Sequence, residues 1–176
     1  MTYRISVWDP FVRLFHWSLV VCFALNAFVL DEESQWHIWI GYTVAGLVAA
    51  RILWGFVGSR YARFSSFPPS IGGAVEQAGD MVAGRVRPHV GHTPLGAWMI
   101  YNLLLALIVI AVSGYLMTTD AFWGLEWPEA IHEAAVTWAE ISVVAHIAAV
   151  LFESHRTRTN LPRAMVTGYK DISAAP

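Results

Sequence analysis

Four stretches of the chain are apolar over the length that a helix needs to cross a bilayer, about 20 residues. They cover roughly residues 11–30, 36–57, 95–117 and 131–153. This pattern predicts an all-α integral membrane protein, a multi-pass four-helix bundle in one domain of residues 1–176 with a tail at 154–176. No small-residue cleavage site follows the first stretch, so we expect it to be retained and not removed as a signal peptide.

The segments between these stretches are short, except for the connection from Gly58 to Pro94. Within it, the sequence IGGAVEQAGDMVAG mixes apolar and polar positions in a pattern that favours a short helix lying on the membrane surface. Thr93 and Pro94 are typical of an N-cap and a first-turn proline, so they predict the start of the third spanning helix.

Composition supports a membrane protein and narrows its chemistry. Hydrophobic residues make up 56% of the chain and charged residues only 14%, where a soluble protein carries about a quarter charged residues. The single cysteine, Cys22, excludes an intramolecular disulfide framework, a cysteine-rich zinc site, an iron–sulfur cluster and a covalently attached c-type haem.

The charges predict how the bundle is oriented. None of the eleven Lys and Arg residues lies in the connection between the first two stretches or between the last two, and both of these connections are acidic. By the positive-inside rule, both termini and the long connection face the cytoplasm. Tryptophans near both ends of the stretches are typical of interfacial anchors in contact with lipid.

Four histidines carry the candidate chemistry. His132 and His146 are 14 residues apart, a rise of about 21 Å and about 40° short of four full turns, so they share one helix face at two depths. Antiparallel helices then place His37 opposite His132 near the outer surface and His16 opposite His146 near the inner one. Two facing imidazoles at each of two levels predict two non-covalent b haems with bis-histidine ligation, which favours electron transfer over oxygen chemistry.

These histidines have two other interpretations. Neighbouring residues support haem binding. The histidines could serve only in packing, whereas one zinc ion could not reach both depths. Arg13 lies on the same helix face as His16, and Arg51 lies on the same helix face as His37, both at the inner level. There they could pair with a haem propionate, although Arg51 could equally anchor its helix at the membrane surface. Gly41, one turn after His37, could let a macrocycle approach the backbone.

Three further histidines, His89, His92 and His155, lie in a loop or at a helix end, and we expect them to be solvated or to cap a helix. Glu140 lies inside the fourth stretch. It could belong to a proton path or quinone pocket, or it could bond to a polar residue such as Asn26.

Several motifs together resemble the bacterial cytochrome b561 and nickel–iron hydrogenase b-type cytochrome family. They are WDPFVRLFHW at Trp8 to Trp17, H-x3-G-x9-R at His37, Gly41 and Arg51, GHTPLG at Gly91 to Gly96, and H-E-x12-H at His132, Glu133 and His146. The resemblance implies a four-helix cytochrome in which His16, His37, His132 and His146 ligate two b haems. Thr93 stands where many relatives have Asn, a difference that does not affect the haem prediction.

The resemblance implies electron transfer across the bacterial inner membrane between the quinone pool and a periplasmic partner, either a c-type cytochrome or a hydrogenase-like protein. One branch of the family instead oxidises superoxide with quinone as acceptor. The acidic outer segments favour a positively charged protein over an anion, so we rank that branch second. We expect an electron-transfer subunit, or a quinone-linked oxidoreductase if it is an enzyme, and no nucleic acid partner. A non-haem transporter or a structural membrane protein is the alternative of another class.

Overall fold

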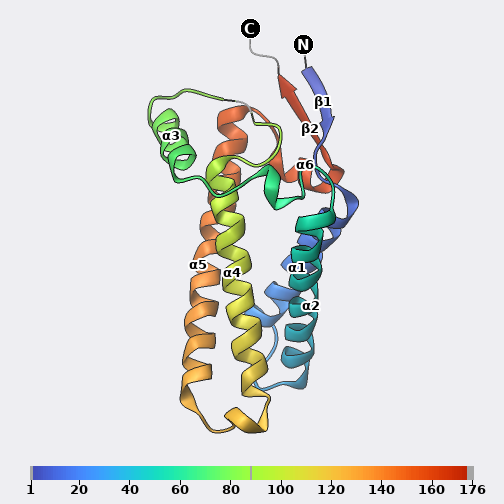
Figure 1. Cartoon of the computed structure of the whole chain (residues 1–176), viewed down its shortest axis with the longest axis vertical. Helices are drawn as coiled ribbons and strands as arrows, with labels where there is room; N and C mark the ends of the chain where they lie inside the picture. Colours follow the sequence, from blue (N-terminus) through green and yellow to red (C-terminus); the bar gives the residue numbers. More distant parts are fainter. Residues whose placement is uncertain (1, 88, 174–176) are drawn as a thin grey trace.

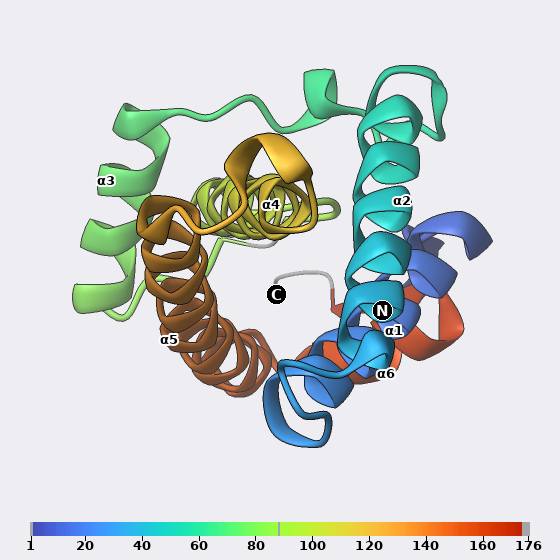
Figure 2. The same cartoon turned by 90° about the horizontal axis from the view of Figure 1, so that it is seen from below.

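The computed structural model describes residues 2–87 and 89–173. Its four long helices are α1 (Pro10–Phe28), α2 (Gln35–Val57), α4 (Pro94–Met117) and α5 (Glu126–Thr157). All four are long and apolar enough to span a membrane. In the chain order, α1 packs on α2, α2 on α4, and α4 on α5, and the four helices surround a common axis (Figure 2). The predicted helical membrane bundle is therefore confirmed.

The first three spanning helices begin and end within about two residues of their predicted limits, but α5 is longer at both ends. It begins at Glu126, and its first turn carries Glu126 and Glu129, while its last turn carries His155 and Arg156. Acidic groups at the start and basic groups at the end of a helix interact favourably with its dipole. The helix therefore continues beyond the apolar stretch that marks the span in the sequence.

The long connection contains the predicted short helix. It is α3 (Ile71–Val82), and the Ser70 side chain caps it by accepting a hydrogen bond from Gly73 N at 3.0 Å. Gln77 lies buried on this helix and accepts a hydrogen bond from Leu95 N at 2.9 Å. That bond fixes α3 against the first turn of α4, which Thr93 caps as predicted.

The tail is more ordered than the sequence suggests. After α5 come α6 (Leu161–Thr167) and the strand β2 (Tyr169–Ser173), which pairs antiparallel with β1 (Thr2–Ser6). Two short single-turn helices complete the described chain, η1 (Phe64–Ser66) and η2 (Asp120–Phe122). The two ends of the chain thus form a small sheet beside one end of the bundle (Figure 1).

Two hydrophobic clusters hold these parts together. Phe15, Val44, Val48, Leu104 and Leu107 join α1, α2 and α4 inside the bundle. Val7, Trp8 and Ala164 join the N-terminal segment to α6. Many large apolar side chains on the outer faces of the spanning helices remain exposed, as expected where lipid covers them.

Charge divides the molecule into two ends. The α1–α2 and α4–α5 connections lie together at one end, while α3, α6, the sheet and both ends of the chain lie at the other (Figure 1). We call these the acidic end and the basic end. The exposed carboxylates of the acidic end are Asp31, Glu32, Glu33, Asp120, Glu126, Glu129 and Glu133. No Lys or Arg lies in either of its connections, so the structure gathers the acidic residues on one surface.

Candidate haem-binding sites

Near the acidic end, α2 and α5 bring His37 and His132 opposite each other. The centroids of their rings are 6.3 Å apart and the ring planes make an angle of 62°. The Ser34 side chain accepts a hydrogen bond from His37 N at 3.2 Å, which caps α2 and places His37 in its first turn. On the same turn, Asn26 Nδ2 of α1 donates to the His37 carbonyl at 3.1 Å.

The orientation of His132 is set by α4. Its Nδ1 lies 3.0 Å from the carbonyl oxygen of Ile110 and 3.1 Å from Ser113 Oγ. Because a carbonyl only accepts hydrogen bonds, Nδ1 carries the proton and Nε2 keeps its lone pair. A Cβ added at Gly114 would lie 3.1 Å from His132 Cε1, so any side chain at this position would push against the ring.

Nearer the basic end lie His16 on α1 and His146 on α5, the second predicted pair. Both are half-buried. The His16 ring meets Trp17 edge-on, with centroids 5.1 Å apart. The structure therefore brings His37 and His132 together, whereas the pairing of His16 with His146 stays a prediction.

Unpartnered polar atoms mark the same two levels. Within the described residues, six buried side-chain nitrogen or oxygen atoms have no hydrogen-bond partner. They are Asn26 Oδ1 and His37 Nδ1 toward the acidic end, and Arg13 Nε, His16 Nδ1, Arg51 Nη1 and His92 Nδ1 toward the basic end. An enclosed polar atom without a partner costs about 1–3 kcal/mol of folding stability. The unpartnered atoms at each level could therefore form hydrogen bonds with a polar ligand.

Arg51 is fixed in the interior, with only 4% of its surface exposed. Its Nη2 donates to the Ala62 carbonyl at 3.1 Å, and its guanidinium carbon lies 5.1 Å from the centre of the Phe64 ring. These contacts do not suit the alternative of an anchor in the lipid headgroups. Gly41 faces open space, since a Cβ added there would meet no atom within 4 Å.

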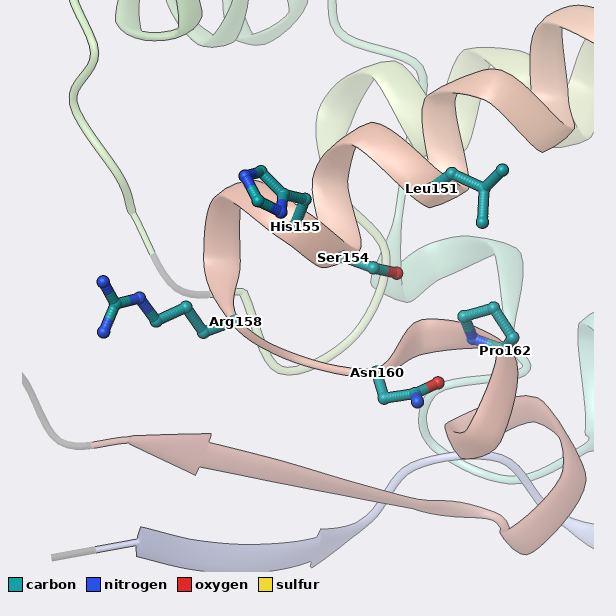
Figure 3. A pocket seen from close by; sticks show the side chains of 6 residues that line it. All are labelled: Leu151, Ser154, His155, Arg158, Asn160 and Pro162. Atoms are coloured by element: carbon teal, nitrogen blue, oxygen red, sulfur yellow. The ribbon is translucent and has the colours of Figure 1, made fainter.

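The histidines outside the two pairs differ from one another. His89 and His155 are exposed, as expected; His155 borders an open pocket between α5 and α6, which none of the paired histidines lines (Figure 3). His92 is not solvated, so that expectation is wrong. Its ring packs 4.6 Å from Trp8 and 4.3 Å from Phe67.

This packing keeps His92 neutral. Burial, with smaller effects from the positive charges of Lys170 and Arg51, lowers the pKa of His92 to about 3.

Glu140 is half-buried on α5. Asn26, a candidate partner for Glu140 in the sequence, instead donates its amide hydrogen to His37.

A bundle of membrane-spanning helices with facing histidines and unpartnered enclosed nitrogens has the construction of a helical membrane cytochrome. Residues 7–168 match the family model of prokaryotic cytochrome b561, and the chain belongs to this family. No curated protein and no solved structure matches the chain. As a member of this family, the chain is a prokaryotic membrane protein that binds b-type haem and takes part in electron transfer. A transporter or structural protein without haem does not fit this membership.

Proposed function

We propose that this chain is a dihaem cytochrome b that relays electrons across the bacterial inner membrane between quinone and a periplasmic redox protein. The observation that carries this proposal is the close approach of the His37 and His132 rings, and it is supported by the half-buried His16 and His146 nearer the basic end of the same bundle. One haem would lie between the members of each pair.

The spacing of the first pair fits a shared metal ion. The ring centroids are 6.3 Å apart, a separation at which both imidazoles could hold one metal ion between them. His132 is held by Ile110 through Nδ1, which leaves Nε2 available as the ligand atom.

The second pair has cationic groups beside it. Arg13 precedes His16 by one turn of α1, and Arg51 lies buried on α2; each has an enclosed nitrogen without a partner among the described residues. Guanidinium groups form strong hydrogen bonds with carboxylates, so these two residues would hold haem propionates. Held by two histidines, each haem would supply a one-electron couple and not an oxygen-binding site.

The division of charge supports an orientation and a partner. The basic end would face the cytoplasm by the positive-inside rule, and the acidic end would face the periplasm. Seven exposed carboxylates there suit a basic c-type cytochrome, with a hydrogenase-like protein as the other class of partner. The same surface repels superoxide, so superoxide oxidation with quinone as acceptor is the second candidate.

Haem counting in variants tests the central assignment. We expect two b haems per wild-type chain, and one in His37→Ala, in His132→Ala and in the double variant, because these two residues would serve one haem. His16→Ala and His146→Ala should each lose the other haem. The exposed His155→Ala is the control and should keep both. Loss of both haems in every single variant, or one haem in the wild type, would contradict the paired arrangement.

A further inference from the structure

His92 lies in the loop before α4, at the basic end of the bundle, and two side chains from distant segments pack against it. Trp8 comes from the segment before α1, and Phe67 follows η1. Lys170 on β2 fixes the neighbouring residue, because its Nζ donates to the Gly91 carbonyl at 2.9 Å. The imidazole is therefore held in place by parts of the chain that are far apart in sequence.

One nitrogen of the His92 ring has no hydrogen-bond partner among the described residues. This nitrogen is Nδ1, and it is enclosed. Since Trp8 and Phe67 pack against the ring with their own rings, they do not satisfy a ring nitrogen. A buried nitrogen that is fixed but unpartnered indicates a hydrogen bond to a group that the protein does not itself supply.

Two more enclosed nitrogens lie at the same end. The Arg51 guanidinium lies over the Phe64 ring at 5.1 Å, and Phe64 packs against Phe67, whose ring packs on His92. Arg13 lies close to Gly168, because a Cβ added at Gly168 would be 3.3 Å from Arg13 Nη1. The Gly168 carbonyl in turn accepts a hydrogen bond from Trp8 N, and the Trp8 ring packs on His92. Arg13, Arg51 and His92 thus offer two cations and one neutral nitrogen in one region, a combination that suits a carboxylate.

We propose that His92 acts with Arg13 and Arg51 as a third binding group for the propionates of the basic-end haem and thereby raises the reduction potential of that haem. This inference rests on the proposed function, which places that haem between His16 and His146. The neutral imidazole would donate its hydrogen bond to a carboxylate and offset part of its negative charge. Reduction adds an electron to the haem, so less negative charge nearby makes reduction more favourable.

A pair of substitutions separates the hydrogen bond from simple packing. His92→Phe fills the space between Trp8 and Phe67 but has no donor, whereas His92→Gln keeps an N–H group. In His92→Phe we expect the equilibrium constant for reducing the basic-end haem to fall about tenfold, which is about 59 mV for one electron. His92→Gln should stay close to the wild type. His89→Phe, in the same loop but exposed, is the control and should change nothing.

The measurement is a redox titration of both haems in purified protein, with the haem content of each variant. Loss of the basic-end haem in His92→Phe together with its retention in His92→Gln would also support the proposal. Equal potentials in the Phe and Gln variants, or loss of haem from both, would overturn it. If the wild type lacked a haem held by His16 and His146, the proposed function would fail first, and haem counting shows this independently.

Discussion

Gly114 lies against a proposed haem ligand of the neighbouring helix. It lies on α4, where the His132 ring of α5 comes so close that a Cβ would be 3.1 Å from Cε1. The ring is also held through Nδ1 by Ile110 and Ser113 of the same helix. A side chain at position 114 would therefore displace the imidazole from both hydrogen bonds at once.

We expect Gly114→Leu to lose the acidic-end haem and Gly114→Ala to weaken its retention, while the basic-end haem remains. The matched control is Gly46→Leu on α2, where an added Cβ meets nothing within 4 Å. The haem-to-protein ratio after purification measures the effect. Two haems retained in Gly114→Leu would show that His132 tolerates displacement or is not a ligand.

Single residues were predictable from sequence where helix geometry alone determines their position. The spacing of His132 and His146, with antiparallel helices, predicted that His37 lies opposite His132, and the structure brings these two rings together. It failed for His92, because the burial of a loop residue depends on contacts with Trp8 and Phe67. Nothing in the local sequence around His92 indicates those contacts.

Among the elements, the spanning helices were predictable from apolar length alone, whereas the sheet at the basic end was not. β1 and β2 are five residues each and come from opposite ends of the chain, so neither carries a periodic signal of its own. Their pairing depends on Gly168, which ends α6 with a φ of 88°. The Gly168 carbonyl accepts hydrogen bonds from Val7 N and Trp8 N at 2.9 and 3.1 Å.

Gly168→Ala should therefore destabilise the junction of the sheet and the bundle. A Cβ there would lie 2.8 Å from the Trp8 carbonyl oxygen, and the positive φ adds backbone strain of about 1–2 kcal/mol. Gly84→Ala is the control, because its φ of 68° is also positive but its Cβ would meet nothing within 4 Å. We expect a larger fall in thermal unfolding temperature for Gly168→Ala. Equal falls would mean that the contact with Trp8 is unimportant.

Lys170 makes the stability of this sheet depend on pH. Burial, opposed in part by Glu153, lowers the pKa of Lys170 from 10.5 to about 8. Between these values the unfolded chain holds a proton that the folded chain has lost. The contribution of Lys170 to stability therefore rises with pH from about 8 to 10.5 and is constant below 8. Thermal unfolding across this range should show the rise in the wild type. Lys170→Met should remove it, and an unchanged slope in that variant would assign the effect to another group.

Across the whole molecule, the two ends differ in whether their charged side chains form ion pairs within the protein. At the basic end, several arginines are already paired within the protein: Arg85 and Arg87 contact Asp80, and Arg156 contacts Glu153. At the acidic end, the described residues form no ion pair, and the carboxylates are exposed. Those carboxylates produce a field that is not neutralised from within, which makes this end the better candidate for long-range attraction of a charged partner.

This difference predicts how the reduced protein reacts with its partner. The rate with a basic c-type cytochrome should be fastest at low ionic strength and fall steeply as salt approaches 0.1 M, where the screening length shortens to about 10 Å. Combined Glu126→Gln, Glu129→Gln and Glu133→Gln should lower the low-salt rate and flatten its salt dependence.

Glu76→Gln is the control, because Glu76 lies on α3 at the basic end and is paired with Arg87. Stopped-flow spectroscopy measures the reaction with the basic c-type cytochrome and, separately, the reaction with superoxide. Superoxide is an anion, so its reaction should be slow at low salt and should speed up when the three glutamates are neutralised. A fast reaction with superoxide alone, slowed by salt, would mean that local positive charge at the reacting site outweighs this acidic surface, and superoxide oxidation would then become the better assignment.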